Sequence, residues 1–321
     1  MHTNEELKQL LQMPLADKIT MSKVRIAEFY EHYDGNVVVS FSGGKDSTVL
    51  LHLVRSLFPN VKGVFCDTGL EFPEVKDHVK SMENIDTIHP QLSFRQVLEQ
   101  YGWVYPSKET AEKIYYAKKG RPWAQCHMAG KEKDGTPSKF KIRYKRWQFL
   151  VDSPFKISNK CCDVMKKNPF HDYIKQHGGG MLVGTMTCES SLRKQAWLRT
   201  GCNAFQLAKG MPLSFWTEED ILQYILDEKL QIPTVYGDIV KVGSRLITTG
   251  EKRTGCMFCP IGVHLEKYPN KFQRMAKTHP KIYDYCIHKL GLGELLDYVG
   301  VDYRPHDEQL NLFEEVHPCS K

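Results

Sequence analysis

The chain has 321 residues and a formal net charge of +6, with 41% hydrophobic and 26% charged residues. These proportions are typical of a globular protein with a full hydrophobic core, in one large domain or two smaller ones. No stretch approaches the roughly 20 apolar residues of a membrane-spanning helix. The polar N-terminus also lacks the apolar core and small-residue cleavage site of a signal peptide. We therefore expect a cytoplasmic protein with no membrane contact.

The positive charge is concentrated in one segment. Residues 107–147 contain 12 Lys or Arg against 4 Asp or Glu, so the rest of the chain is slightly acidic. Aromatic residues are interleaved with the basic ones, as in KFKIRYKRW. The segment is either a solvated surface insertion or a face that contacts the phosphates of a nucleic acid, DNA or tRNA.

The first third of the chain alternates between helix and strand. Apolar spacing predicts, in order, a helix over 16–33, a strand over 36–41, a helix over 47–58, a strand over 61–69 and a helix over 72–82. Short links between such elements imply parallel strands joined by crossover helices. In such sheets, functional residues gather at the carboxyl ends of the strands.

The remainder is expected to complete an α/β fold, a parallel sheet with helices on both faces. The residues from 100 to 150 are expected to form an insertion or an irregular segment, because Gly120-Arg121-Pro122 and Gly135-Thr136-Pro137 interrupt them. The later elements expected are a helix over 169–177, a strand over 181–185, a helix over 213–229 capped by Thr217 and Asp220, and a helical region from 263 to 296. The predicted domains are residues 1–262, with a basic insertion at about 104–150, and residues 263–321.

The stretch S-F-S-G-G-K-D-S follows the first predicted strand. It lacks the G-x-x-x-x-G-K-[ST] spacing of P-loop NTPases. Two glycines nevertheless allow backbone N–H groups to approach phosphate oxygens, and a following helix N-terminus favours negative charge. Lys45 adds a positive charge, whereas Asp46 would repel a bare phosphate. Asp46 therefore fits either as a helix cap or as a ligand of Mg²⁺ that bridges phosphates.

The sequence SFSGGKDST resembles the pyrophosphate loop of the N-type ATP pyrophosphatases. It is most similar to the branch that contains phosphoadenosine-phosphosulfate reductases, the ATP sulfurylase small subunit and DNA phosphorothioation sulfurtransferases. Further matches follow in order over about residues 24–275: CDTGLEFPE, CESSLR, PLSFWTEEDILQYI, IPTVYGDI and TGCMFCP. The resemblance implies an adenine nucleotide alpha hydrolase-like fold that binds ATP. Such enzymes cleave ATP between the α- and β-phosphates, leaving pyrophosphate and an adenylylated acceptor.

The resemblance also assigns roles to individual residues. The pyrophosphate would be held by Ser40, Ser42, Gly43, Gly44, Lys45, Asp46 and Ser47, and the nucleotide would lie against Asp67, Thr68 and Gly69. Glu189 and Arg193 match an E-S-x-x-R element, in which Arg193 contacts a phosphate or forms a structural pair with Glu189. Arg253 is expected to contact a phosphate as well. The residues expected to be catalytic are Lys45, Asp46, Arg193 and Cys188, the last as a possible sulfur carrier.

Two pairs of cysteines form a second signal, Cys161-Cys162 and Cys256-x-x-Cys259. Four thiolates fit tetrahedral zinc or an iron–sulfur cluster, and a redox pair is a further alternative. Assimilatory adenylylsulfate reductases of the same superfamily hold a [4Fe-4S] cluster with a C-C…C-x-x-C pattern, and this resemblance favours the cluster. Cys126, beside His127, is expected to be structural, as are Cys66, Cys202 and Cys286.

Three functional hypotheses follow. In the first, ATP activates an acceptor, for which the basic segment favours a nucleic acid, and sulfur is delivered with help from the cluster and from a partner such as a cysteine desulfurase. In the second, an adenylylated sulfate is reduced to sulfite. Reductases usually end in E-C-G-[LI]-H, and the tail EEVHPCSK does not match around Cys319. In the third, the chain is a non-catalytic nucleotide-binding module. The intact loop favours the first hypothesis.

Overall fold

A computed structural model describes residues 2–132, 134–138 and 144–306. The chain divides into two compact units. Unit 1 combines residues 1–92 with 164–257, and unit 2 combines residues 93–163 with 258–321. Each unit is therefore built from two separate stretches of the chain, and the domain division expected from the sequence stays a prediction.

Unit 1 is organised around a mostly parallel sheet. Within the described residues its six strands are arranged in the order β3-β2-β1-β4-β6-β5. Their bounds are β1 Val37–Ser40, β2 Lys62–Cys66, β3 Ile85–Ile88, β4 Gly180–Val183, β5 Asn203–Ala204 and β6 Lys209–Gly210. Only β5 of these strands is antiparallel to its neighbour. This strand order confirms the expected α/β fold, although β3, β5 and β6 have no counterpart among the sequence expectations.

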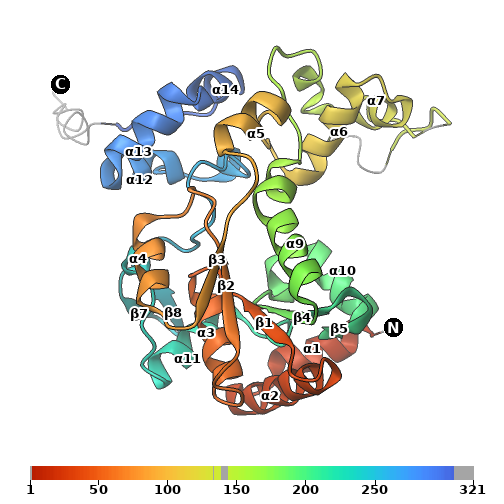
Figure 1. The fold of residues 1–321 in the computed structure, drawn as a ribbon. Helices are drawn as coiled ribbons and strands as arrows, with labels where there is room; N and C mark the ends of the chain where they lie inside the picture. Colours follow the sequence, from red (N-terminus) through yellow and green to blue (C-terminus); the bar gives the residue numbers. More distant parts are fainter. Residues whose placement is uncertain (1, 133, 139–143, 307–321) are drawn as a thin grey trace, which may run out of the picture. The chain divides into compact units, whose positions relative to one another are not determined.

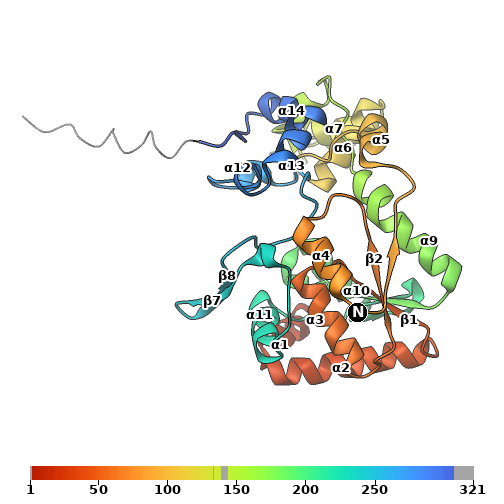
Figure 2. The same cartoon turned by 60° about the vertical axis from the view of Figure 1, so that its left-hand side comes forward.

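Helices cover both faces of this sheet, and Figures 1 and 2 both show α4 and α9 on opposite sides of β1 and β2. The helices of unit 1 are α1 Asn4–Gln12, α2 Leu15–His32, α3 Lys45–Arg55, α4 Pro73–Ser81, α9 Asn168–His177, α10 Ser191–Thr200 and α11 Glu218–Asp227. Helix α3 is almost wholly buried because five of its apolar side chains are inaccessible to solvent: Val49, Leu50, Leu51, Leu53 and Val54. Helix α11 begins at the predicted cap, where Thr217 and Asp220 form a capping box.

The sheet register brings three loops of unit 1 together. Ser40, the last residue of β1, is paired with Val64 on one side and with Val183 on the other. Because the strands are parallel, the chain leaves β1, β2 and β4 at the same edge of the sheet. A two-stranded hairpin formed by β7 (Ile239–Val242) and β8 (Arg245–Thr248) completes the described strands of this unit.

Unit 2 is helical. Its helices are α5 Phe94–Tyr101, α6 Lys108–Lys118, α7 Pro122–Met128, α12 Lys271–Thr278, α13 Pro280–Asp284 and α14 Leu292–Tyr298. The expectation of an irregular segment is wrong for α6 and α7. The buried Ala111, Ile114 and Ala117 lie at a helical spacing of three, and the high lysine content of the segment obscures this stripe. In the part of the chain that the structure describes, no helix is long and apolar enough to cross a bilayer.

Candidate functional site

The glycine loop lies at the edge of the sheet where β1 ends. Gly43 has a φ of +73°, and a Cβ atom there would come within 2.8 Å of two valine methyl groups, on Val75 and Val79. Gly44 is the N-cap of α3 and has no side chain with which to cap the helix. The alternative that Asp46 caps this helix is wrong, because Asp46 lies within its first turn. The N-cap residue of α3 thus contributes no side-chain cap, which leaves room for an anion near the start of the helix.

The loop hydroxyl groups hold the shape of the loop. The Ser47 hydroxyl donates to the Gly44 carbonyl at 2.9 Å and accepts from the Ser42 amide at 3.2 Å. The hydroxyl oxygens of Ser42 and Ser47 are 3.1 Å apart. Ser40 ends β1 just before them. The expected phosphate ligands Ser42 and Ser47 are therefore placed together, and each already orders the loop.

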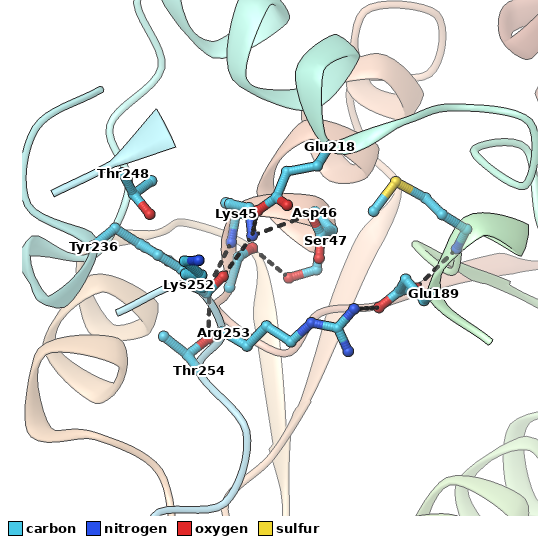
Figure 3. A network of polar contacts seen from close by, with 12 residues as sticks. Lys45, Asp46, Ser47, Glu189, Glu218, Tyr236, Thr248, Lys252, Arg253 and Thr254 are labelled. Atoms are coloured by element: carbon cyan, nitrogen blue, oxygen red, sulfur yellow. Dashed lines mark hydrogen bonds and ion pairs between the residues drawn. The ribbon is translucent and has the colours of Figure 1, made fainter. Parts of the chain in front are cut away.

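Lys45 is almost fully buried, with 3% of its surface exposed. Its ammonium group donates to the Lys252 carbonyl at 2.9 Å and forms an ion pair with Glu218 at 3.4 Å (Figure 3). The Asp46 carboxylate is farther away, with Oδ1 4.0 Å from Lys45 Nζ, and this oxygen is buried without a hydrogen-bond partner. Burial raises the pKa of Asp46, and Glu218 adds to this shift while Lys45 opposes it. A cation near Asp46 would relieve this electrostatic cost.

Two arginines converge on Glu189. Its carboxylate accepts a hydrogen bond from the Met186 amide at 3.1 Å and forms an ion pair with Arg193. It also lies 3.7 Å from Arg253 (Figure 3). Burial, together with the neighbouring Arg253, lowers the pKa of Arg193. The Glu189–Arg193 pair, which the sequence offered as the alternative to a phosphate contact, is therefore present, and the phosphate contact of Arg193 stays a prediction. Two guanidinium groups share one carboxylate, so this part of the site has an excess of positive charge and is suited to a phosphate.

The residues after β2 form a tight turn. Burial would raise the pKa of Asp67, but Lys76 at 2.8 Å and the Gly69 amide at 2.9 Å lower it below its ordinary value. The Thr68 hydroxyl donates to Glu71 at 2.7 Å. Gly69 has a φ of +75°, and nothing lies within 4 Å of a Cβ atom built there. The turn thus leaves open space beside Gly69.

Cys188 has an exposed thiol next to Glu189. Its Sγ lies 3.6 Å from the Trp216 carbonyl, to which it donates. Partial burial raises the pKa of this thiol despite the nearby Arg253, so Cys188 is protonated at neutral pH. A thiol in this state is not activated as a nucleophile. The role of Cys188 as a sulfur carrier stays a prediction.

The structure adds two residues that the sequence reasoning left without a role, Tyr236 and Thr254. The buried Tyr236 hydroxyl accepts a hydrogen bond from the Lys45 amide at 3.2 Å and lies 2.7 Å from the Thr254 hydroxyl. Both side chains are close to Gly44, where a Cβ atom would come within 3.0 Å of them. The matched stretches IPTVYGDI and TGCMFCP contain these residues, so a signal for them was present in the sequence.

The four cysteines expected to bind metal lie close in sequence to the two points, after residues 163 and 257, at which the chain passes from one unit to the other. Cys161, Cys162 and Cys259 belong to unit 2, and Cys256 is the second-last residue of unit 1. Among the described residues no group of three or more His, Cys, Asp or Glu is arranged to hold a metal ion. The predicted set therefore remains a hypothesis, and Cys319 lies outside the described residues.

Lysines lie beside two of these cysteines. In unit 1, burial alone would lower the pKa of Lys166, but Cys256 and Glu71 raise it above its ordinary value. In unit 2, burial raises the pKa of Cys259, the neighbouring Cys162 raises it further, and Lys271 opposes both. Positively charged lysines thus accompany a soft, all-sulfur donor set, which is the kind that iron–sulfur clusters and zinc both accept.

Comparison with known proteins identifies the family. The family model described as phosphoadenosine phosphosulfate reductase domain matches residues 36–125 and 108–261, more than half of the chain. The adenosine 5'-phosphosulfate reductase of Mycolicibacterium smegmatis is 24% identical over 79% of this chain and 91% of its own length. The enzyme of the same name from Staphylococcus epidermidis is 24% identical over 63% of this chain, which spans 65% of that relative.

Solved structures show more distant likenesses. The phosphoadenylyl-sulfate reductase of Candida auris has a TM-score of 0.38 at 13% identity and covers 76% of this chain and 98% of its own. The U34-tRNA thiolase NcsA of Methanococcus maripaludis, solved with its [4Fe-4S] cluster, has a TM-score of 0.34 at 12% identity, over 91% of this chain and 84% of its own. Similarities of this size carry no conclusion about the function of this chain.

Proposed function

Because the chain belongs to the phosphoadenosine phosphosulfate reductase domain family, we propose that it binds ATP and cleaves it between the α- and β-phosphates. The adenylyl group would pass to an acceptor oxygen, pyrophosphate would leave, and sulfur would then displace AMP from the acceptor. The observation that carries this proposal is the complete loop S-G-G-K-D-S, with Lys45 and Asp46 in the first turn of α3 after a glycine N-cap. A buried carboxylate would repel the anionic phosphosulfate of adenylylsulfate, whereas ATP arrives with Mg²⁺, which a carboxylate can bind.

Different residues would bind different parts of the nucleotide. The backbone N–H groups at the start of α3 and the Lys45 ammonium would hold the pyrophosphate portion. Asp46 and Glu218, both in contact with Lys45, are the carboxylates that would hold Mg²⁺. Arg193 and Arg253 would neutralise the α-phosphate as charge develops on it. The nucleoside would lie against Asp67, Thr68 and Gly69, where the turn leaves space.

The test is release of pyrophosphate from ATP and Mg²⁺, with and without added DNA or tRNA as acceptor. We expect release by the native chain and its loss in Lys45→Ala, since Lys45 is the buried cation of the loop. Lys62→Ala is the matched control, because Lys62 is an exposed lysine at the start of β2, the end of the sheet opposite to the loop. If ATP stays intact under all these conditions, the proposal is wrong.

We further propose that Cys161, Cys162, Cys256 and Cys259 hold a [4Fe-4S] cluster, with zinc as the alternative metal. A cluster of this kind supplies iron that can bind and deliver sulfur. Protein purified without oxygen should be brown, with absorbance near roughly 400 nm from thiolate-bound iron, and Cys256→Ala should lose iron. Cys202→Ala is the control, since Cys202 is buried in the core of unit 1 beside Ser214. A colourless protein that contains zinc would reject the cluster.

A second candidate function is the reduction of adenylylsulfate to sulfite. It is favoured by the relatives from Mycolicibacterium and Staphylococcus, which are named for this reaction. The discriminating assay incubates the protein with adenylylsulfate and a thiol reductant and measures sulfite. Sulfite formation with ATP left intact would replace the first proposal with the second. If neither substrate reacts while ATP binds, the chain is a nucleotide-binding module.

The acceptor proposed for the first function is a nucleic acid, reached through the basic residues between 107 and 147. The described lysines and arginines of this segment lie in unit 2, and residues 133 and 139–143 lie outside the described part. Sulfur would come as a persulfide from a partner protein such as a cysteine desulfurase, and a thiol reductant would supply the two electrons that bring it to the sulfide level. Stimulation of pyrophosphate release by DNA or by tRNA would identify the class of acceptor.

A further inference from the structure

Helices α6 and α7 carry three neighbouring aromatic rings. The Tyr115 and Tyr116 ring centroids are 5.3 Å apart, and the Tyr116 and Trp123 centroids are 5.4 Å apart. All three side chains are half-buried, so each ring keeps part of its surface in solvent. The rings come from both sides of the turn between the helices, because Tyr115 and Tyr116 lie in the last turn of α6 and Trp123 is the second residue of α7.

Positively charged side chains surround these rings. Lys113 Nζ lies 5.1 Å from the Trp123 ring centroid, and Lys119 Nζ lies 4.4 Å from that of Tyr115. Arg121 is exposed in the turn between the helices. Residues 113–123 contain four Lys or Arg and no Asp or Glu. The aromatic–basic surface is defined here as Lys113, Tyr115, Tyr116, Lys119, Arg121 and Trp123.

The turn that carries this surface is held in place. Lys118, the fourth cation, donates to the Ser153 carbonyl at 2.6 Å and so anchors the end of α6. Gly120, with a φ of +70°, has nothing within 4 Å of a Cβ atom built on it, so the turn faces open space. Pro122 fixes the first turn of α7. The aromatic rings and the basic side chains are therefore attached to a turn whose backbone conformation is fixed.

We propose that the aromatic–basic surface binds single-stranded nucleic acid, with bases stacked on the rings and phosphates bound by Lys113, Lys119 and Arg121. Partly exposed rings beside lysine and arginine are the combination that recognises unpaired bases together with their phosphates. A duplex hides its base faces and would use only the charges. An acidic polypeptide would likewise leave the rings without a partner. The inference rests on the proposed function for its biological use, while the binding itself requires neither ATP nor the cluster.

The test measures the binding of a fluorescein-labelled single-stranded 12-mer, as DNA and as RNA, to the full chain by fluorescence anisotropy over a salt series. We expect the single strands to bind more tightly than the corresponding duplex. Trp123→Leu should weaken binding roughly 5- to 150-fold, the range for the loss of one stacking ring, whereas Trp123→Phe should largely retain it. Circular dichroism of each variant checks that the fold is unchanged.

The phosphate contacts are tested with Lys119→Gln/Arg121→Gln. This double variant should lower the slope of log affinity against log salt by about 1.4, because each contact with a single strand contributes about 0.7. The control is Lys281→Gln/Lys289→Gln, two exposed lysines elsewhere in unit 2 that remove the same charge. It should leave the slope unchanged.

Four results would overturn the inference: no binding of either strand, equal or tighter binding of the duplex, equal weakening by the control variant, or displacement of the 12-mer by polyglutamate at an equal concentration of charge. Pyrophosphate release in the absence of nucleic acid is measured in parallel. If that activity persists while no 12-mer binds, this inference fails and the proposed ATP chemistry stands. If the 12-mer binds while ATP stays intact, the proposed function fails instead.

Discussion

Gly43→Ala tests the argument that the loop is shaped by close packing as well as by a positive φ. At φ +73° an L-residue is strained by about 1–2 kcal/mol. The added Cβ would also come within 2.7 Å of a Val79 methyl and 2.8 Å of a Val75 methyl. Both valines are buried, so neither can swing away freely, and overpacking of this kind costs about 1–3 kcal/mol. The expected loss of unfolding free energy is therefore about 2–5 kcal/mol.

Gly243→Ala is the matched control, because Gly243 has a φ of +62° with nothing within 4 Å of a Cβ built there. Gly243→Ala should lose only the unfolding free energy that corresponds to backbone strain at positive φ, about 1–2 kcal/mol. Urea denaturation followed by circular dichroism gives both values from the midpoints and a common slope. The double variant Gly43→Ala/Val79→Ala should recover part of the packing term, so its effects should be non-additive. Equal losses for Gly43→Ala and Gly243→Ala would refute the reasoning.

Three further predictions concern the same unit. Tyr236→Phe removes the hydroxyl that pairs with Thr254 and accepts a hydrogen bond from the Lys45 amide, so urea denaturation should show a loss of about 1–3 kcal/mol in unfolding free energy. If Thr254→Val lowers the unfolding free energy equally in the native chain and in Tyr236→Phe, the two hydroxyls are not coupled. Asp46→Asn should abolish pyrophosphate release yet stabilise the fold at pH 7. Burial raises the pKa of Asp46, so the folded state binds more protons than the unfolded state, and stability falls as the pH rises from the ordinary aspartate pKa through the raised one. The stability that Asp46→Asn gains at pH 7 should therefore shrink in melting curves taken toward pH 4. A gain in stability that does not depend on pH would contradict this account. Thr217→Ala removes the hydroxyl that caps α11, so thermal unfolding should show a loss of about 1 kcal/mol in unfolding free energy. An unchanged unfolding free energy would show that the cap is dispensable.

Local features of the sequence account for the elements that were predicted well. The β-branched run before Ser40 specifies a buried strand, and the two glycines after it specify a turn into a helix, because both depend on residues close together in the chain. The cap of α11 at Thr217 is equally local. The helices α6 and α7 were missed because a few buried positions, such as Ile114, set the helical period while lysines dominate the composition.

The arrangement of the site depended on the fold. Sequence patterns are enough to predict that a glycine loop with Lys45 and Asp46 follows a strand and opens a helix. They did not determine that Tyr236, 191 residues later, accepts a hydrogen bond from the Lys45 amide, or that Arg253 joins Arg193 on Glu189. Such contacts follow from the register of the parallel strands and from the loops that return to the same edge of the sheet. Local preferences act over a few residues, whereas these partners are selected only when the whole sheet has formed.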